Sequence, residues 1–408
     1  MLGVDTFAKI SRICEASPRR KRSLDTATPL FTEERKAKLQ KIVFHQKLGS
    51  VWDKVERVRA LAEELCAVTG ADKKLVAEAA NLCKMDLVTE TVGEFPELQG
   101  QVGRQLSALT KGNHESVAAA IEDHYRPLGP NDRVPTDKVA VTLALADKLD
   151  TLVTFWVIEE RPTGSSDPYA LRRAALGVIR TLLQSEVRIG VRELIVQHTS
   201  KRLAEKFDPT FWSGVAATRP PGGPSEPIQS LSHNLLAFLV DRLAVQLRDQ
   251  GKRHDLVDAV FALGDDDLVR IVARVEALDA FLKTEDGANL LAGYKRAANI
   301  LAAEEKKGKW SAEEAKGQVD ASKLAEPAEK ALFDALEKAL PAARAAVEKE
   351  DFAAAMKALS GLRAPVDAFF EKVLVNAEDP MLRRNRLLLL SRLREALSQV
   401  ADFSKIEG

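Results

Sequence analysis

The stretch VWDKVERVRALAEEL, residues 51–65, decides the fold class of this chain. Its apolar residues recur every three or four positions, at Val51, Val55, Val58, Leu61 and Leu65. This spacing places them on one face of an amphipathic helix. The same spacing returns further along the chain, at Leu235, Phe238, Leu239, Leu243 and Leu247. Both stretches predict helices with one buried face.

The composition also favours helices. Aromatic residues make up 5% and hydrophobic residues 45% of the 408 residues. Short β-branched runs with abundant Ala, Leu, Glu, Lys and Arg are typical of helices rather than sheets, so we predict an all-α protein. The 60 basic and 60 acidic residues cancel, so a surface that binds nucleic acid must come from local clustering of charge.

Breaks in the helical pattern predict the domain organisation. Proline and glycine interrupt it at residues 127–135, 162–168 and 219–224, because proline fixes φ and lacks an N–H group. The polar stretch 304–323 is expected to fray or to form a solvated helical excursion. The predicted parts are a divergent or disordered N-terminus (1–32), a first helical domain (33–215), a linker (216–229) and a second helical region (230–408).

The cysteines and the apolar runs bear on the compartment. Cys14, Cys66 and Cys83 are an odd, scattered set without a C-x-x-C pair, which disfavours both a disulfide framework and a thiolate metal site. The apolar run Leu387–Leu390 is far shorter than the roughly 20 residues that span a bilayer. We therefore expect a cytoplasmic protein with no membrane partner.

His45, Asp86 and Asp147 are degenerate candidates for a metal site. Their order resembles that of the HD-type metal-dependent phosphohydrolases, in which a histidine, a His-Asp pair and a distant aspartate bind one metal. Met85 stands where that pattern has its second histidine, and a thioether is a poor ligand for a hard divalent cation. We predict no resident metal and an HD-like fold kept as a scaffold. Alternatively, His45 is a partly buried helix histidine, and Asp147 pairs with Lys148 or with a backbone group.

Several longer blocks carry a more specific resemblance. In the first part of the chain they are DLVTETVGEFPELQG (86–100), AIEDHYRP (120–127), ADKLDTL (146–152) and PTGSSDPYALRR (162–173). In the second part they are KRAANIL (295–301), PVDAFF (365–370), LRRNRL (382–387) and ADFSK (401–405). In this order the blocks resemble the beta subunit of bacterial glycyl-tRNA synthetase, the glycine-tRNA ligase, over residues 33 to 408.

The resemblance implies a division of labour between two kinds of subunit. Glycyl-adenylate is made with ATP and Mg²⁺ on a separate alpha subunit, and two alpha and two beta chains assemble. This chain would then bind the tRNA for glycine, with no catalytic residue and no cofactor of its own. The implied fold is an HD-like helical domain followed by a helical-bundle anticodon-binding domain. Beta subunits carry a large region before the segment that resembles Phe44–His45, so we expect a truncated, split or minimal form.

Basic and amide side chains within these blocks are the candidate tRNA contacts. They are Arg383, Asn385, Arg386, Lys295, Arg296, Asn299, Arg172 and Arg173. Guanidinium groups suit phosphates, and an amide can position a base edge. Alternatively, the arginines of residues 383–386 form salt bridges inside a helical bundle, and Lys295 with Arg296 belongs to a solvated charged face. Ser166 or Asp167 is predicted to cap a helix that starts near Pro168.

Three classes of function remain open from the sequence. A synthetase subunit would support glycylation only together with an alpha subunit. A non-catalytic RNA-binding remnant would bind tRNA without that support. An HD-type phosphohydrolase would hold a metal that is lost on Asp147→Ala and would cleave a nucleotide by itself.

Overall fold

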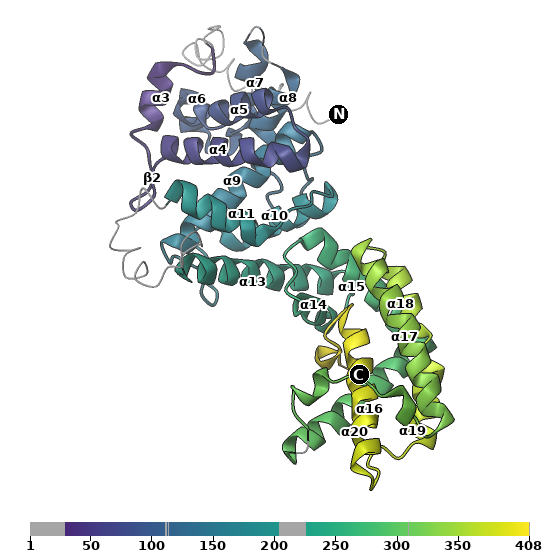
Figure 1. Ribbon diagram of the computed structural model, residues 1–408. Helices are drawn as coiled ribbons and strands as arrows, with labels where there is room; N and C mark the ends of the chain where they lie inside the picture. Colours follow the sequence, from purple (N-terminus) through teal and green to yellow (C-terminus); the bar gives the residue numbers. More distant parts are fainter. Residues whose placement is uncertain (1–28, 111, 113, 204–225, 309, 408) are drawn as a thin grey trace. The chain divides into compact units, whose positions relative to one another are not determined.

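The computed structural model describes residues 29–110, 112, 114–203, 226–308 and 310–407 (Figure 1). These residues form two compact units, unit 1 ending at Leu243 and unit 2 beginning at Ala244. Within the described ranges, the β-structure is one two-stranded antiparallel sheet and one isolated bridge, which confirms the all-α prediction. The predicted linker, residues 216–229, lies mostly outside the described residues, so the predicted domain boundaries stay predictions.

Unit 1 is built from short and long helices with one β-hairpin (Figure 1). Its first half contains α3 (Glu33–Leu39), β1 (Val43–His45), β2 (Gly49–Ser50), α4 (Val51–Thr69), α5 (Lys73–Leu82), η1 (Met85–Val88), α6 (Glu90–Glu94) and η2 (Pro96–Leu98). Its second half contains α7 (Gln101–Leu109), α8 (Glu115–Asp123), α9 (Lys138–Val157), α10 (Leu171–Gln184), α11 (Val191–His198) and η3 (Thr199–Leu203). Helix α13 (Glu226–Asp249) contains the boundary between the units.

Helix α9 forms the centre of unit 1. It contacts α4, α8 and α10, and it is buried on almost every side, as expected for a helix whose residues are apolar all round. The Asp137 carboxylate caps its start by accepting from the N–H groups of Val139 and Ala140. The buried charged residues Lys148 and Asp150 are therefore exceptions inside an apolar helix.

The helices predicted from apolar spacing are confirmed. The first predicted stretch lies within α4, which begins at a capping box formed by Ser50 and Asp53 and ends at Gly70 in the left-handed region, with φ +65°. Such ends satisfy backbone groups that the helix leaves unpaired. The second lies within α13. All of the residues that defined the two periodicities except Phe238 supply buried core side chains, such as Leu61 and Leu243.

The loop before α10 confirms one capping prediction and corrects a helix start. The Asp167 carboxylate accepts from the N–H groups of Leu171 and Arg172, so Asp167 is a cap as predicted. The helix begins at Leu171 rather than near Pro168, because Ala170 has a left-handed φ of +54° that interrupts helical geometry. The backbone of Thr163 and Ser166 closes the turn between them with two hydrogen bonds.

Unit 2 is a bundle of helices (Figure 1). Its elements are α14 (His254–Phe261), α15 (Leu268–Leu282), α16 (Glu285–Lys306), η4 (Glu314–Lys316), η5 (Ala321–Lys323), α17 (Pro327–Glu348), α18 (Phe352–Ser360), α19 (Arg363–Lys372), α20 (Pro380–Ser398) and η6 (Phe403–Lys405). Helix α16 contacts α20 and α19, while α17 contacts α18, α19 and α20. The run Leu387–Leu390 faces the core of this bundle.

The polar stretch 304–323 is mostly exposed and contains the short helical turns η4 and η5, so of the two predicted forms it agrees with a solvated helical excursion rather than with a frayed segment. Glu304 is buried within it, and so is Trp310. The Asn385 side chain holds the backbone of Asp320 by accepting from its N–H group at 2.8 Å and donating to its carbonyl oxygen at 3.1 Å. Buried anchors far apart in sequence fix this stretch, and charge composition alone could not reveal them.

The structure describes two of the three cysteines and the lengths of the helices. Cys66 and Cys83 are free, whereas Cys14 lies outside the described residues. Burial raises the pKa of Cys83 to about 12, which keeps this thiol protonated. Within the part of the chain that the structure describes, every helix is too short or too polar to cross a membrane.

Candidate functional site

The three candidate metal ligands of unit 1 have separate partners. His45 lies 3.6 Å from the Glu160 carboxylate and packs edge-on against Phe155. The Asp86 carboxylate accepts from two backbone N–H groups, at 2.6 and 3.2 Å, and Asp147 lies beside two lysines. Across the described residues, no three His, Cys, Asp or Glu side chains surround one point as metal ligands. His45, Asp86 and Asp147 therefore follow the order of a metal-binding pattern in the sequence, but they do not surround a common point in the structure.

Buried lysines surround Asp147 instead. The ammonium groups of Lys54 and Lys84 each lie 3.3 Å from its Oδ1 atom. Burial by itself would raise the pKa of Asp147, but the two ammonium groups outweigh burial and lower it well below the usual value. The neighbouring lysines thus favour the charged form of Asp147, which lies at the centre of a buried ionic network. The expected alternative of a partner at Lys148 is replaced by these two lysines.

A second buried carboxylate, Asp150, joins α9 to α4 and to the end of α11. Arg57 donates to both of its oxygens, at 2.8 and 3.2 Å. His198 Nε2 lies 3.1 Å from the same carboxylate, and Lys54 Nζ lies 3.5 Å away. Burial opposes ionisation of Asp150, but Arg57 and Lys54 prevail and lower its pKa below the usual range. This network fixes three helices around one charge.

Lys148 gives unit 1 a testable dependence on pH. It donates to the carbonyl oxygens of His124 and Arg126, at 2.9 and 2.6 Å, and burial lowers its pKa from 10.5 to about 8. Between these values the unfolded chain holds a proton that the folded chain has released, so stability rises with pH. We expect the free energy of unfolding of unit 1 to gain about 2 kcal/mol from this group between pH 8 and 10.

Urea unfolding of wild type and Lys148→Met at several pH values between 7.5 and 10 measures this contribution. Lys148→Met should lose the rise with pH, whereas the exposed Lys47→Met should keep it. Equal pH dependence in all three proteins would show that Lys148 titrates normally in the folded chain.

The arginines and the asparagine near the start of α20 have partners inside unit 2. Arg386 forms an ion pair with Glu329 and donates to the carbonyl oxygen of Leu374 at 2.8 Å. Arg383 forms an ion pair with Glu304, and Asn385 is occupied by the Asp320 backbone. Arg383 and Arg386 thus form the salt bridges of the alternative interpretation. The geometry gives no support to tRNA contact by Arg383, Asn385 or Arg386, and this contact stays a prediction.

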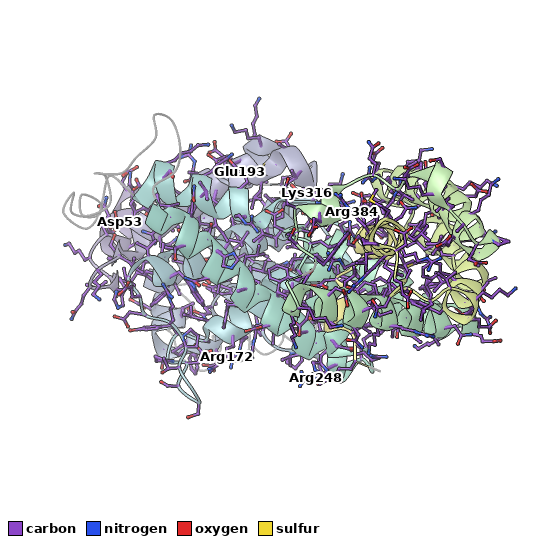
Figure 2. All side chains as sticks on the ribbon, turned by 60° about the horizontal axis from the view of Figure 1, so that its bottom comes forward. Asp53, Arg172, Glu193, Arg248, Lys316 and Arg384 are labelled. Atoms are coloured by element: carbon purple, nitrogen blue, oxygen red, sulfur yellow. The ribbon has the colours of Figure 1, made fainter. Side chains whose placement is uncertain are left out.

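The candidate arginines of unit 1 behave differently from one another. Arg172 donates to the carbonyl oxygens of Gly164 and Ser166, at 2.6 and 3.4 Å, and so braces the loop before α10 (Figure 2). Arg173 is exposed on the same helix. Of the two, Arg172 is bound to this loop and Arg173 is exposed to solvent. Contact of either arginine with tRNA stays a prediction.

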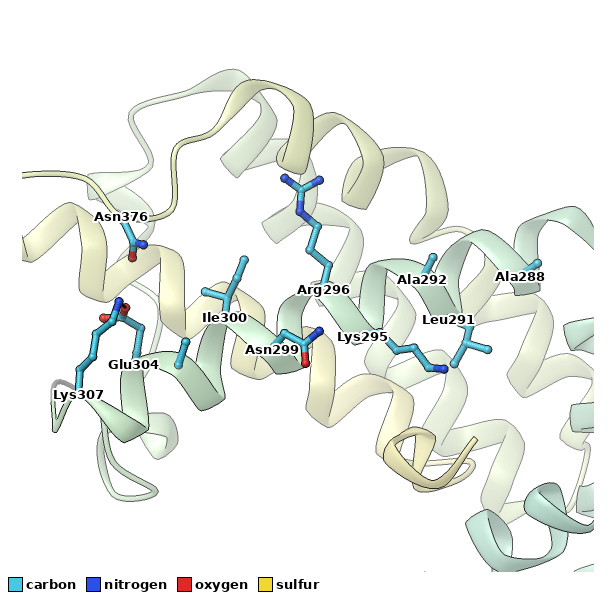
Figure 3. Close-up of a pocket in the computed structure, with 11 residues that line it drawn as sticks. Ala288, Leu291, Ala292, Lys295, Arg296, Asn299, Ile300, Glu304, Lys307 and Asn376 are labelled. Atoms are coloured by element: carbon cyan, nitrogen blue, oxygen red, sulfur yellow. Dashed lines mark hydrogen bonds and ion pairs between the residues drawn. The ribbon is translucent and has the colours of Figure 1, made fainter. Parts of the chain in front are cut away.

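The remaining candidates, Lys295, Arg296 and Asn299, line a groove on α16 (Figure 3). The groove has a volume of about 770 Å³, and two neighbouring rows of side chains at i, i+4 spacing form its floor. The first row is Ala288, Ala292, Arg296, Ile300 and Glu304, and the second is Leu291, Lys295, Asn299, Ala303 and Lys307. Asn376, in the segment after α19, lies across from them (Figure 3).

The charges of this α16 groove are mainly positive. The guanidinium carbon of Arg296 lies over the Phe370 ring, 4.5 Å from its centroid, a cation–π contact that favours this position of the cation. Lys307 is 54% exposed and pairs with Glu304 at 3.0 Å. Glu304 is buried and also pairs with Arg383, so the one carboxylate of the groove is neutralised. The small residues of the floor leave room for a flat apolar ligand beside these cations.

Two groove residues, Lys307 and Asn376, were missing from the sequence prediction. Lys307 lies eight positions after Asn299, on the same i, i+4 row, so helical spacing could have revealed it. Asn376 follows a different helix, and only the tertiary structure brings it to the groove. The sequence therefore contained a signal for Lys307 but none for Asn376.

The charged core of unit 1 was missed for a similar reason. Lys54 lies three positions after Val51 and four before Val58, so it shares the apolar face of α4 that predicted the fold. Arg57 lies three positions further on. A cation on a buried face requires a buried partner, and this rule could have pointed to the acidic residues of α9. Lys84, in a short turn, carries no such signal.

Comparisons with known proteins identify the family. Residues 24–262, more than half of the chain, match the family model described as the glycyl-tRNA synthetase beta subunit. The chain belongs to this family. The resemblance predicted from the sequence blocks is thereby confirmed, including the assignment to an aminoacyl-tRNA synthetase family.

Two further matches concern the second part of the chain and its length relative to a known protein. Residues 290–407 match the DALR anticodon binding domain, and this range includes most of the α16 groove. The glycine-tRNA ligase beta subunit of Phenylobacterium zucineum (strain HLK1) is 51% identical over 380 residues, which is 92% of this chain and 50% of that relative. The chain therefore spans about half the length of the curated relative that it matches.

Proposed function

We propose that this chain binds the tRNA for glycine as the beta subunit of a glycine-tRNA ligase, and that the α16 groove contacts the RNA. The observation that carries the proposal is the cationic groove lying inside the segment that matches an anticodon binding domain. Glycyl-adenylate is made with ATP and Mg²⁺ on a separate alpha subunit, in an assembly of two alpha and two beta chains in the cytoplasm. This chain contributes no catalytic residue.

The groove suits single-stranded RNA better than a duplex. Single-stranded regions present unstacked bases, and such bases bind flat surfaces and guanidinium planes. Arg296, whose guanidinium lies over the Phe370 ring, offers such a plane beside the small residues Ala292 and Ala303. Along α16 the groove extends about 28 Å, enough for several nucleotides. Phosphates would be neutralised by Lys295 and Lys307, and amides at Asn299 and Asn376 would meet base edges.

The contribution of this chain to the reaction is positional. Binding energy from tRNA contacts distant from the reacting atoms can hold the terminal ribose against an adenylate on another subunit. Such a role needs a rigid RNA-binding surface, and it needs no proton transfer by the side chains of this chain. The salt-bridged bundle of unit 2 supplies the rigidity, because buried ion pairs connect α20 to α16 and α17.

The test of the proposed function is glycylation of tRNA by the matching alpha subunit with and without this chain. Stimulation by this chain supports the proposal. Tight tRNA binding without stimulation would instead identify a non-catalytic RNA-binding remnant. Nucleotide cleavage by the chain alone, lost on Asp147→Ala, would identify a phosphohydrolase and contradict the proposal.

The groove itself is tested by Lys295→Gln/Arg296→Gln/Lys307→Gln. We expect tRNA affinity at physiological salt to fall on the order of tenfold to a hundredfold, because the two lysine contacts to phosphate, with their counterion release, and the guanidinium plane of Arg296 are lost. The slope of log K against log salt should become shallower by about 1.4, or about 0.7 for each of the two phosphate contacts on a single strand. Filter binding or fluorescence anisotropy over a salt series measures both quantities.

A matched control has the same change of net charge on another helix. Lys330→Gln/Lys338→Gln/Lys349→Gln removes three exposed cations from α17 and its end, and it should bind tRNA nearly as wild type does. An equal loss in both triple variants would mean that only overall charge matters, and it would remove the α16 groove from the proposal. Unfolding curves of both variants show that the fold is retained.

A further inference from the structure

The ammonium group of Lys84 lies where two potential metal ligands converge. Its Nζ atom is 2.7 Å from His124 Nε2 and 3.3 Å from Asp147 Oδ1. Lys84 and His124 are both buried, and Nζ also lies 4.0 Å from the centroid of the Tyr125 ring. The imidazole and the aromatic face come from consecutive residues at the end of α8 and the carboxylate comes from α9, so tertiary packing has gathered two segments around the positive charge of Lys84.

The hydrogen bonds of His124 define which ring nitrogen faces the ammonium group. Nδ1 lies 2.8 Å from the carbonyl oxygen of Ile121, and a carbonyl only accepts, so Nδ1 carries the proton. Nε2 then presents its lone pair to Lys84, which only donates. Burial and the neighbouring Lys84 charge lower the pKa of His124 well below its usual value, in keeping with a neutral ring. A neutral imidazole lone pair beside a carboxylate is the donor set that divalent transition metals prefer.

We propose that the Lys84 ammonium group takes the place of a metal ion between His124 and Asp147, so that unit 1 carries its central cation within its own chain. Lys54 places a second ammonium group 3.3 Å from the same Asp147 oxygen. Together the two lysines supply the two positive charges that one divalent ion would bring. The residues around Asp147 do not fit a resident metal, because the ammonium groups of Lys54 and Lys84 already occupy the space beside its carboxylate where a metal ion would bind.

The proposal changes the meaning of the degenerate metal pattern in the sequence. The ligands His45, Asp86 and Asp147 expected from that pattern are not gathered, whereas His124 and Asp147 are gathered around an internal cation. A tethered ammonium group cannot dissociate, so the link that Lys84 makes between α9 and the end of α8 is independent of metal supply. This inference does not depend on the proposed tRNA-binding function, because it concerns unit 1 alone.

The consequence to be measured is that removal of the ammonium group creates a zinc site. Lys84→Ala in the full chain leaves a cavity with a lone pair and a carboxylate, so it should bind about one additional equivalent of Zn²⁺ relative to wild type. Its melting temperature should fall by several degrees without Zn²⁺ and recover at least half of the loss with Zn²⁺. Metal analysis after equilibrium dialysis and thermal unfolding with Zn²⁺ or with EDTA measure these effects.

Three control proteins separate a zinc site from general damage. Lys84→Met fills the space without a charge and should be destabilised without zinc rescue. Lys84→Ala/His124→Ala lacks the nitrogen ligand and should not bind the additional zinc. Lys148→Ala removes a buried ammonium group that donates to carbonyl oxygens, and it should not gain zinc either.

Two results would overturn the proposal. One is a Lys84→Ala protein that binds no more Zn²⁺ than wild type and Lys148→Ala. The other is wild-type protein that is purified with a tightly held metal, loses it to EDTA and melts at a lower temperature afterwards. If Lys84→Ala does not fold in the absence of metal, refolding with Zn²⁺ decides the matter: recovery supports the proposal and failure to recover overturns it.

Discussion

Asp150→Asn is expected to lower the free energy of unfolding of unit 1 by about 3–5 kcal/mol. The substitution keeps the size of the side chain and removes its charge. Arg57, which donates to both oxygens of Asp150, is buried and would be left with an amide in place of its carboxylate. Loss of one partner from a buried ion pair is costly because the remaining charge cannot reach water.

Acid sensitivity should change together with stability. The pKa of Asp150 is depressed in the folded chain below its usual value of 3.8, so its contribution is present above pH 3.8 and is lost as the pH falls below it. Asp150→Asn should therefore unfold less steeply with acid than wild type, from a lower starting stability. Asp147, whose pKa is also depressed, keeps part of the acid sensitivity in the variant.

Urea unfolding at pH 7 and at pH 3–4 measures these effects, and hydrogen exchange across α4 and α9 assigns them to unit 1. Glu97→Gln, a charge loss at an exposed position, is the control and should stay within about 0.5 kcal/mol of wild type. A small effect of Asp150→Asn, similar to that of Glu97→Gln, would mean that Arg57 is solvated in the folded protein.

The helices of this protein could be predicted because their signal is local. Apolar spacing predicted α4 and α13. Helix boundaries depend on single backbone conformations, such as the positive φ of Ala170, and a sequence without glycine there gives no warning of them. The anchors of the polar stretch 304–323, such as Asn385, could not be predicted because they lie more than 60 residues away in the chain.

The candidate sites were less predictable than the fold, since function depends on which way a charged side chain points. Lys295, Arg296 and Asn299 line a groove, whereas Asn385 and Arg386 turn inward. The two groups look alike in sequence, because each places basic residues and an asparagine within five positions. Their difference comes from the partners Glu329 and Asp320, which other parts of unit 2 bring to α20.

Arg386→Ala is expected to lower the free energy of unfolding of unit 2 by about 3–5 kcal/mol. The Arg386 side chain is 9% exposed and that of its partner Glu329 is 2% exposed, so the substitution leaves a buried carboxylate without its cation. It also removes the donor to the carbonyl oxygen of Leu374. Chemical unfolding followed by hydrogen exchange in α17 and α20 measures the loss.

Two further variants decide whether this arginine acts in the core or on RNA. Arg384→Ala removes the exposed neighbouring guanidinium (Figure 2) and should change stability by less than about 0.5 kcal/mol. Arg386→Met/Glu329→Leu replaces both charges with apolar groups and should recover most of the stability lost in Arg386→Ala. If the recovered double variant also binds tRNA as wild type does, Arg386 is a core residue. If it folds stably and binds tRNA weakly, the guanidinium contacts RNA after all, and the ion pair with Glu329 must open for binding.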